Sequence, residues 1–552
     1  MLGHRPSSPL VGALLALALA AIVLLPNLGG YALWNPDEGR HSEVAREVLE
    51  AHGWRGRVVP AFNGMPYHDK PILYYLAVST SYALGGVDEG SARAVSALAA
   101  TATVLAVYAA AATAWSVGAG VAAAGVLVTG IEFVALGRYG SLDMLLTCWI
   151  TLGTLACWRW TERPASVGWL VAAAAAAALG TLTKGLVAPV LIGGATLGAL
   201  ALQRRLGMLR VRPLATAAVV YLVLAVPWHV AAWHVDPDYI RDFFLRHQIQ
   251  RFAADTRHFH PKPFWFPTAI TLAGFLPWTA LLPAAFAGGL AATIRRAPLA
   301  MLAAVWVVVV VGFFSASSGK LGTYVLPAFP PLALLLGPYC WRVATEGPSS
   351  PTERRLLVGG VALIALVCVL TWPLLAAFAR GRDGGAWRDV IPLAGLGIPL
   401  GAAALALAVR RPTSAPAAVG AAMVAIVVCF YTLAAPRVSD VVSDAPIAAT
   451  IARHGGPEVP VVVYSAQTPS LVFYLRRPVR HVASADGMRR ARERRPLVFL
   501  VTGTRHAAVV HQAGGFWLWQ STGKHLLFAS QPPPTAAAGV VASAGAPRWA
   551  IM

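Results

Sequence analysis

Long runs of apolar residues, each close to twenty residues in length, recur from Leu10 to about residue 435. A helix needs about 20 such residues to cross the hydrocarbon core of a bilayer. The runs are continuous and do not alternate with polar residues, which excludes a transmembrane β-barrel. Only 12% of the residues are charged, whereas soluble domains carry about a quarter. The sequence therefore predicts a mainly α, polytopic helical membrane protein.

Thirteen segments are predicted to span the membrane. Residues 1–28 are not expected to be a cleaved signal, so the first span is expected to be retained. The spans lie near residues 10–28, 92–115, 118–136, 142–160, 166–181, 184–202, 213–235, 265–290, 298–315, 322–343, 355–379, 388–409 and 414–435. The apolar segment Ile72–Gly86 is shorter and is predicted to be re-entrant or interfacial. With the N-terminus inside, every arginine-rich short loop then falls on the cytoplasmic side, as the positive-inside rule requires.

The same assignment gathers the unusual charged segments on the opposite, outer face. They are the loop at residues 30–71, Arg138–Asp143, the turn at Lys184, Asp236–Phe264 and Ser315–Lys320. Polar residues placed at random in the loops would not sort in this way. We therefore expect an active site that faces outward.

After Pro436 the pattern changes to short β-branched runs separated by polar and glycine-containing stretches. Such runs are typical of strands, so a small α/β domain is expected outside the membrane. Its predicted strands lie within residues 459–465, 477–483, 495–503 and 524–530. We divide the chain into a transmembrane domain at 1–435, with its catalytic loop at 30–71, and an extracytoplasmic domain at 436–552. The last stretch, from Pro532, is predicted to be poorly ordered.

Composition also excludes several classes of function. The five cysteines all lie in apolar runs, which indicates neither a disulfide framework nor a metal site. The formal net charge is +20, but the basic residues are spread over loops and are not interleaved with exposed aromatic residues. Nucleic-acid binding is therefore not expected, whereas contact with anionic lipids and anionic ligands is.

The loop from residue 35 to residue 71 concentrates charge in a chain that otherwise has little. Asn35 can cap a helix, Pro36 suits its first position, and Glu38 can close a capping box. Asp37 would then complement the helix dipole at least. Because carboxylates at membrane depth are costly, we expect Asp37 to take part in catalysis or ligand binding.

The loop ends in His68-Asp69-Lys70-Pro71. Proline restricts the residue before it, and so fixes where Lys70 points. A lysine at the bilayer surface suits a phosphate group as a point charge. The alternative is a lysine that merely extends its amine to the interface.

Three other outer segments contribute candidate residues. Asp143 is expected to cap or begin a helix on the same face, and Lys184 either extends to the interface or binds an anion. Phe243–Phe266 combines arginines and histidines, including His258 and His260, which are a weak signal for a metal site. Ser315–Tyr324 lacks the spacing of a P-loop, yet it offers small residues, a lysine and backbone amides that can hold a phosphate.

Short motifs in a fixed order carry a resemblance to a known family. They are W-N-P-D-E-G-R at 34–40, E-V-A-R-E at 43–47, G-W at 53–54, H-D-K-P at 68–71, G-S-L-D at 140–143, L-T-K-G at 182–185, H-Q-I-Q-R-F at 247–252, P-F-W at 263–265, F-L-P-W at 275–278 and S-S-G-K-L-G-T-Y-V-L-P-A-F-P-P at 317–331. The chain resembles the bacterial polyprenyl-phosphate-dependent glycosyltransferases of the GT-C fold. Within them it is most similar to the aminoarabinose transferases of lipid A, and more broadly to the dolichyl-phosphate-mannose protein mannosyltransferase-like group.

This resemblance implies roles for individual residues. Asp37 would be the key carboxylate, with Asp143 as its partner. The phosphate of an undecaprenyl-phosphate carrier would be held by Lys70, Arg251 and Tyr324, and Lys320 is added from the loop described above. The region where an acceptor or a metal would bind takes in Glu38, His68, Asp69 and His247. The family often has glutamate at the position of Asp69, where a bound metal has been proposed.

The expected reaction moves a sugar from the carrier to a lipid or glycoprotein acceptor, such as lipid A, with inversion, at the outer face of a bacterial inner membrane. No cofactor is required for this chemistry, although a divalent metal would be compatible with it, and no nucleotide sugar is expected. A flippase for lipid-linked sugars is the alternative of another class; it predicts charges near the bilayer midplane. A protein O-mannosyltransferase is the alternative within the same class.

Overall fold

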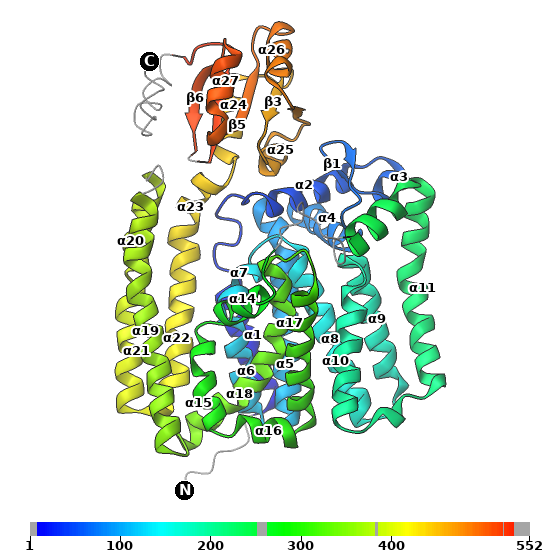
Figure 1. Ribbon diagram of the computed structural model, residues 1–552, viewed down its shortest axis with the longest axis vertical. Coiled ribbons are helices and arrows are strands. Elements are labelled where there is room, and N and C mark those ends of the chain that lie inside the picture. The colour runs from blue at the N-terminus through cyan, green and yellow to red at the C-terminus, as the bar shows by residue number, and fades with distance from the viewer. Residues whose placement is uncertain (1–7, 251–261, 381–384, 523, 535–552) are drawn as a thin grey trace.

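The computed structural model describes residues 8–250, 262–380, 385–522 and 524–534. It shows a bundle of long helices with a small α/β domain standing on one end (Figure 1). Short helices and a hairpin lie between the bundle and this domain.

Most helices of the bundle follow one another through short connections; longer segments lie between α1 and α5 and between α11 and α14. In the first half they are α1 (Pro9–Leu24), α5 (Glu89–Ala114), α6 (Val117–Val128), α7 (Ile131–Gly137), α8 (Leu142–Glu162), α9 (Val167–Lys184), α10 (Val187–Leu202) and α11 (Val211–Val235). In the second half they are α14 (Phe266–Gly274), η3 (Trp278–Leu281), α15 (Leu282–Ala287), α16 (Leu290–Arg296), α17 (Pro298–Ala316), η4 (Gly322–Ala328), α18 (Phe329–Glu346), α19 (Pro351–Arg380), α20 (Gly385–Ala394), α21 (Gly397–Arg410), α22 (Ala415–Cys429) and η6 (Phe430–Ala434).

Within the described residues, eight helices are long and apolar enough to cross a membrane. The number rises to ten when two bent pairs are each counted as one span: α6 with α7, bent by 73°, and α14 with the segment Trp278–Ala287, bent by 92°. Helices α1 and α10 are shorter apolar helices. Helix α8 has 21 residues and is therefore about 31 Å long. Each of the predicted spans thus coincides with a helix or a bent pair of the described chain.

Small residues allow the helices of the bundle to pack closely. A Cβ added at Gly337 of α18 would lie 2.4 Å from the Cα of Ala123 in α6. A Cβ at Gly118 of α6 would lie 2.2 Å from the indole of Trp341 in α18. Close contacts made possible by small residues are the usual basis of helix association in membranes, where no hydrophobic force drives one apolar helix against another.

The segment that follows α1 forms the layer between bundle and domain. It contains α2 (Asp37–Glu50), α3 (Gly53–Val58), the antiparallel hairpin β1 (Ala61–Phe62) and β2 (Met65–Pro66), and α4 (Leu73–Gly85). Helix α4 has 13 residues and is about 20 Å long. It is too short to cross a bilayer, in agreement with the interfacial segment predicted there.

The start of α2 differs from its predicted form. The helix begins at Asp37, its N-cap is Pro36, and no side chain caps it. The carboxylate of Glu38 accepts a hydrogen bond from the backbone N of Trp34 at 2.8 Å rather than from that of Asn35. The prediction of Asn35 as the cap was wrong because this side chain is engaged by the C-terminal domain, as described below.

The C-terminal domain is a five-stranded sheet with the order β4-β3-β5-β7-β6. Strands β3 (Val461–Tyr464), β4 (Arg480–Val482) and β5 (Phe499–Gly503) are parallel, and β6 (Trp517–Ser521) and β7 (His525–Ala529) form an antiparallel hairpin on the edge of β5. Its helices are α24 (Ala445–His454), α25 (Pro469–Leu475), α26 (Ala485–Glu493) and α27 (Ala507–Ala513). The four predicted strands are present, and β6, which contains two tryptophans, was not predicted.

The membrane helix before this domain continues further than the change in composition indicates. Helix α22 runs through η6 into α23 (Ala435–Val442), and α24 follows after Asp444. The structural boundary therefore lies near Ser443, a few residues beyond Pro436. Residues 535–552, which include most of the predicted tail, lie outside the described residues.

Candidate active site at one end of the helical bundle

Glu38 anchors the first turn of α2 to the bundle. It is fully buried, and its carboxylate accepts hydrogen bonds from Arg93 Nε at 2.7 Å and Nη2 at 2.9 Å, and from the backbone N of Gly140 at 2.9 Å. Arg93, also fully buried, donates to the carbonyls of Leu28, Tyr31 and Ala32 at 2.7–3.0 Å. All acceptor positions of Glu38 are thus used inside the protein, and its predicted place in an acceptor or metal region is not supported by this geometry.

Asp37, by contrast, remains open to solvent. Its side chain is 46% exposed, and Oδ1 accepts from Arg40 Nη1 at 3.2 Å on the next turn of α2. A carboxylate with this exposure can be approached by a substrate from outside. Two neighbouring acidic residues of one helix start therefore have different surroundings: Glu38 points into the protein and Asp37 out of it.

His41 lies one turn beyond Asp37, and its surroundings show which charges gather here. The side chain is buried, with Nδ1 at 3.0 Å from the hydroxyl of Tyr75 in α4. Burial lowers the pKa of His41 to about 3, and the positive charges of Arg40, Lys70 and Lys184 act in the same direction, against Asp143. Charges from the loop, from α2, from α8 and from α9 therefore converge around one imidazole, which stays neutral at physiological pH.

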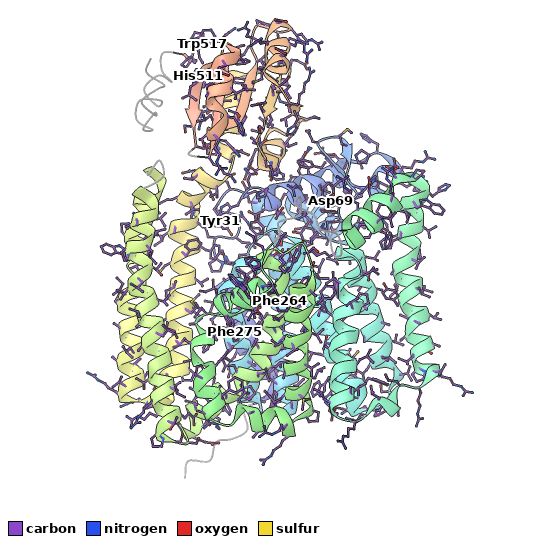
Figure 2. All side chains as sticks on the ribbon, in the orientation of Figure 1. Tyr31, Asp69, Phe264, Phe275, His511 and Trp517 are labelled. Atoms are coloured by element: carbon purple, nitrogen blue, oxygen red, sulfur yellow. The ribbon has the colours of Figure 1, made fainter. Side chains whose placement is uncertain are left out.

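The turn that ends the loop is linked to the same cluster through tyrosines. Tyr67 is hydrogen-bonded to Tyr75, so that a chain of hydroxyl groups runs from the loop before Lys70 to His41. Lys70 Nζ donates to the carbonyl of Asp69 at 2.9 Å. Figure 2 shows Asp69 at the same end of the bundle as Tyr31, beneath the C-terminal domain.

Asp143 and Lys184 form an ion pair between α8 and α9. Only 13% and 12% of their side chains are exposed, and Lys184 Nζ also lies 4.4 Å from the centre of the Tyr324 ring. Ser141 is the N-cap of α8, a role left open for Asp143 by the sequence. The predicted residues Asp143 and Tyr324 are thus brought together by Lys184, which settles that this lysine is paired rather than extended to the interface.

The remaining predicted residues have other surroundings. His68 is held between two carboxylates, with Nε2 at 3.1 Å from Asp236 and Nδ1 at 3.4 Å from Asp242. Lys320 is buried and donates to the carbonyl of Ser317 at 2.5 Å, within its own loop. Its predicted contact with a phosphate therefore competes with a role in holding that loop.

Four predicted residues cannot be placed. Arg251, with His258 and His260, lies outside the described residues, as does the side chain of His247, whose backbone belongs to η2 (Arg241–Gln250). Among the residues that the structure describes, no group of three or more His, Cys, Asp or Glu side chains could hold a metal ion.

An apolar cavity of about 340 Å³ lies in the bundle beside α19, α21 and α22. Its lining includes Ile131, Leu276, Cys368, Leu400 and Phe430, and it contains almost no polar surface. A cavity of this composition accepts hydrocarbon rather than a sugar or a phosphate.

Sequence reasoning missed two residues that shape the site. Arg93 could have been found because it is a charged residue inside a predicted span, where such residues face protein partners. Arg40 lies three residues after Asp37, a spacing at which opposite charges meet on a helix.

Comparison with known proteins agrees with this architecture. Residues 69–233 match the family model described as dolichyl-phosphate-mannose-protein mannosyltransferase. The undecaprenyl phosphate-alpha-4-amino-4-deoxy-L-arabinose arabinosyl transferase of Serratia proteamaculans is 32% identical over 66% of this chain and 65% of its own length. The transferase of that name from Yersinia pestis is 31% identical over 70% of both chains. The first of these relatives is therefore covered over slightly less than two thirds of its length.

Among solved structures, ArnT from Cupriavidus metallidurans, crystallised with undecaprenyl phosphate, superimposes with a TM-score of 0.78. It is 23% identical, and the match covers 95% of this chain and 98% of that one. The fold defines a polytopic membrane protein of the GT-C class with a small extramembrane domain, which confirms the predicted fold class. The chain belongs to the family of undecaprenyl phosphate-aminoarabinose arabinosyl transferases, as its motifs indicate.

Proposed function

We propose that this protein transfers a sugar from an undecaprenyl-phosphate carrier to lipid A at the extracytoplasmic face of a bacterial inner membrane, with inversion at the anomeric carbon. The donor is inferred from the names of the relatives given above, and ArnT was crystallised bound to undecaprenyl phosphate. The observation that carries the proposal is the convergence of charges around His41 at one end of the bundle: Lys70, the Asp143–Lys184 pair, and Arg40, which is itself paired with Asp37.

In the proposed reaction the bond between the anomeric carbon and the carrier phosphate breaks, and undecaprenyl phosphate leaves with the electron pair. An oxygen of the acceptor forms the new bond from the opposite face of the sugar ring. The departing phosphate gains negative charge, and cations held at the site stabilise it electrostatically. Among the described residues, Lys70 is the cation that we assign to this role. The resemblance to the family implies that Arg251 acts with it.

The role of Asp37 depends on the acceptor. A lipid A phosphate attacks through an oxygen that has no proton to lose, so Asp37 then orients the acceptor or stabilises positive charge that develops on the sugar. A hydroxyl acceptor must lose its proton, and Asp37 is then the general base. Its exposed carboxylate is compatible with either contact.

The surroundings of the site fit substrates with lipid tails. The pair of Asp143 with Lys184 fixes the position of the ammonium group beside Tyr324. The apolar cavity beside α19 and α21 offers space for a hydrocarbon chain. Charged groups thus lie at one end of the bundle while the space for hydrocarbon lies within it.

Replacing Asp37 tests the proposal. The Asp37→Asn variant, reconstituted with an undecaprenyl-phosphate-linked aminoarabinose donor and lipid A, should lose at least a hundredfold in kcat, since it keeps the shape and removes the charge. Asp238→Asn is the matched control, because Asp238 is 66% exposed near the same end of the bundle and pairs with Arg241 at the surface. Mass spectrometry of lipid A gives the readout. Undiminished transfer by Asp37→Asn would reject the assignment.

A protein acceptor is a second candidate, because the matching family model describes protein mannosyltransferases. Supplying lipid A and an unfolded serine-rich peptide as competing acceptors distinguishes the two. A flippase is less well supported, because it would carry a lipid-linked sugar past the midplane, whereas the cluster lies at one end of the bundle. We further propose that no cofactor is required, so that addition of EDTA should leave the transfer rate unchanged.

A further inference from the structure

A buried polar network joins the C-terminal domain to the loop that carries Asp37. Its centre is Asp444, which is fully buried between α23 and α24. One carboxylate oxygen accepts from His525 Nδ1 of β7 at 2.6 Å, and the other accepts from Asn35 Nδ2 at 2.6 Å and from the hydroxyl of Ser470 at 3.1 Å. Side chains of three segments far apart in the sequence therefore share one carboxylate.

Asn35 is bound by this domain and by the end of α23 through three of its polar groups. Besides its bond to Asp444, its side-chain oxygen accepts from the backbone N of Ser470 at 2.9 Å. Its own backbone N donates to the carbonyl of Val442 at 3.2 Å. The residue two positions before Asp37 is thus fixed in position and orientation by the C-terminal part of the chain.

A second contact fixes the other side of the same turn. A Cβ added at Gly39 would lie 2.5 Å from the backbone N of Ser470, so α25 touches the backbone of α2 directly at this glycine. Asn35 and Gly39 lie two residues before and two residues after Asp37. The C-terminal domain therefore holds the backbone of this turn, while the side chain of Asp37 remains open to substrate.

The hydrogen bonds around Asp444 favour one position of Asn35 relative to the C-terminal domain. A buried carboxylate that loses a partner pays the desolvation cost of an unsatisfied charge, so a fully bonded network resists displacement. A displacement of about 1 Å at a catalytic group can cost about a hundredfold in rate. The network is therefore placed where a small movement would affect the chemistry.

We propose that the C-terminal α/β domain positions Asp37, and that Asn35 is the positioning residue through which it acts. This inference rests on the proposed transfer reaction for its kinetic consequence, but the positional restraint itself can be measured separately. The domain needs no ligand of its own for this role.

The test exchanges the amide of Asn35 and the carboxylate of Asp444. Asn35→Asp places a second carboxylate against Asp444 and should lower kcat at least tenfold, with the KM for the donor within twofold of the wild type. Adding Asp444→Asn restores a carboxylate–amide pair with the groups exchanged, and should recover most of the lost rate. Hydrogen exchange should be faster at the backbone N–H groups of Gly39 and Arg40, which close the first turn, in the single variant and normal in the double variant.

Asn63→Ala is the matched control. Asn63 makes the other paired contact of this loop with the domain, to the backbone of Val479 at 2.8 and 2.9 Å, and lies away from Asp37 in sequence. Its loss should leave kcat unchanged. Full activity of Asn35→Asp, failure of the exchanged pair to recover, or an equal loss in Asn63→Ala would each overturn the inference. Should the wild type transfer no sugar, the proposed function fails, and hydrogen exchange at Gly39 alone decides the positional restraint.

Discussion

The buried pair of Glu38 and Arg93 allows the sharpest prediction about stability. Both side chains are fully buried, and the Glu38 carboxylate accepts four hydrogen bonds, two from Arg93 and one each from the backbone N of Trp34 and Gly140. Glu38→Gln keeps the shape, removes the charge and turns a donor toward groups that are themselves donors. The arginine then remains buried without its counter-ion.

The structure sets the expected size of the effect. Breaking a buried ion pair by changing one partner costs about 3–5 kcal/mol. Arg93 keeps three backbone carbonyls and the face of the Tyr31 ring, 3.7 Å away. These contacts compensate part of the loss, so we expect the lower value, about 3 kcal/mol, which is roughly a hundredfold in the unfolding equilibrium.

Equilibrium unfolding in mixed micelles with increasing SDS measures this difference. Asp486→Asn is the control, since Asp486 is 72% exposed and its contact with Arg489 lies on the surface of the C-terminal domain. A surface pair of this kind contributes about 0.5 kcal/mol or less. If Glu38→Gln unfolds as late as that control, the buried pair does not hold the loop and the reasoning is refuted.

Two further predictions concern the interior of the site. Because burial holds the pKa of His41 at about 3, against about 6.5 when unfolded, acid protonates the unfolded chain first. The free energy of unfolding should fall from pH 6.5 toward pH 3, by about 1.6 kcal/mol between pH 6.5 and pH 5, and His41→Gln should remove that slope in unfolding curves. Asp143→Asn and Lys184→Met should each lower the transfer rate at least tenfold. Because the two side chains act as a pair, the double variant should be no slower than the slower single variant. Additive losses would show that the two side chains act separately.

Much of this architecture follows from the sequence alone. The length of each apolar run predicts its span, because a helix must cover a fixed thickness of hydrocarbon. Short apolar, β-branched runs predict four of the five strands, and only β6, rich in tryptophan, lacks the pattern. The ordered motifs predict the family. These signals are local in the sequence, so they can be recognised without knowledge of the fold.

Contacts between distant segments were decided only by the tertiary structure. Asp37 and Glu38 are adjacent and chemically alike, yet one is open to solvent and the other is buried against Arg93 of another helix. Lys184 is equally compatible with an anion site or the interface until α8 brings Asp143 to it. No local pattern indicates that Asn35 binds Asp444 rather than capping α2, because hydrogen bonds depend on distance in space and not on position along the chain.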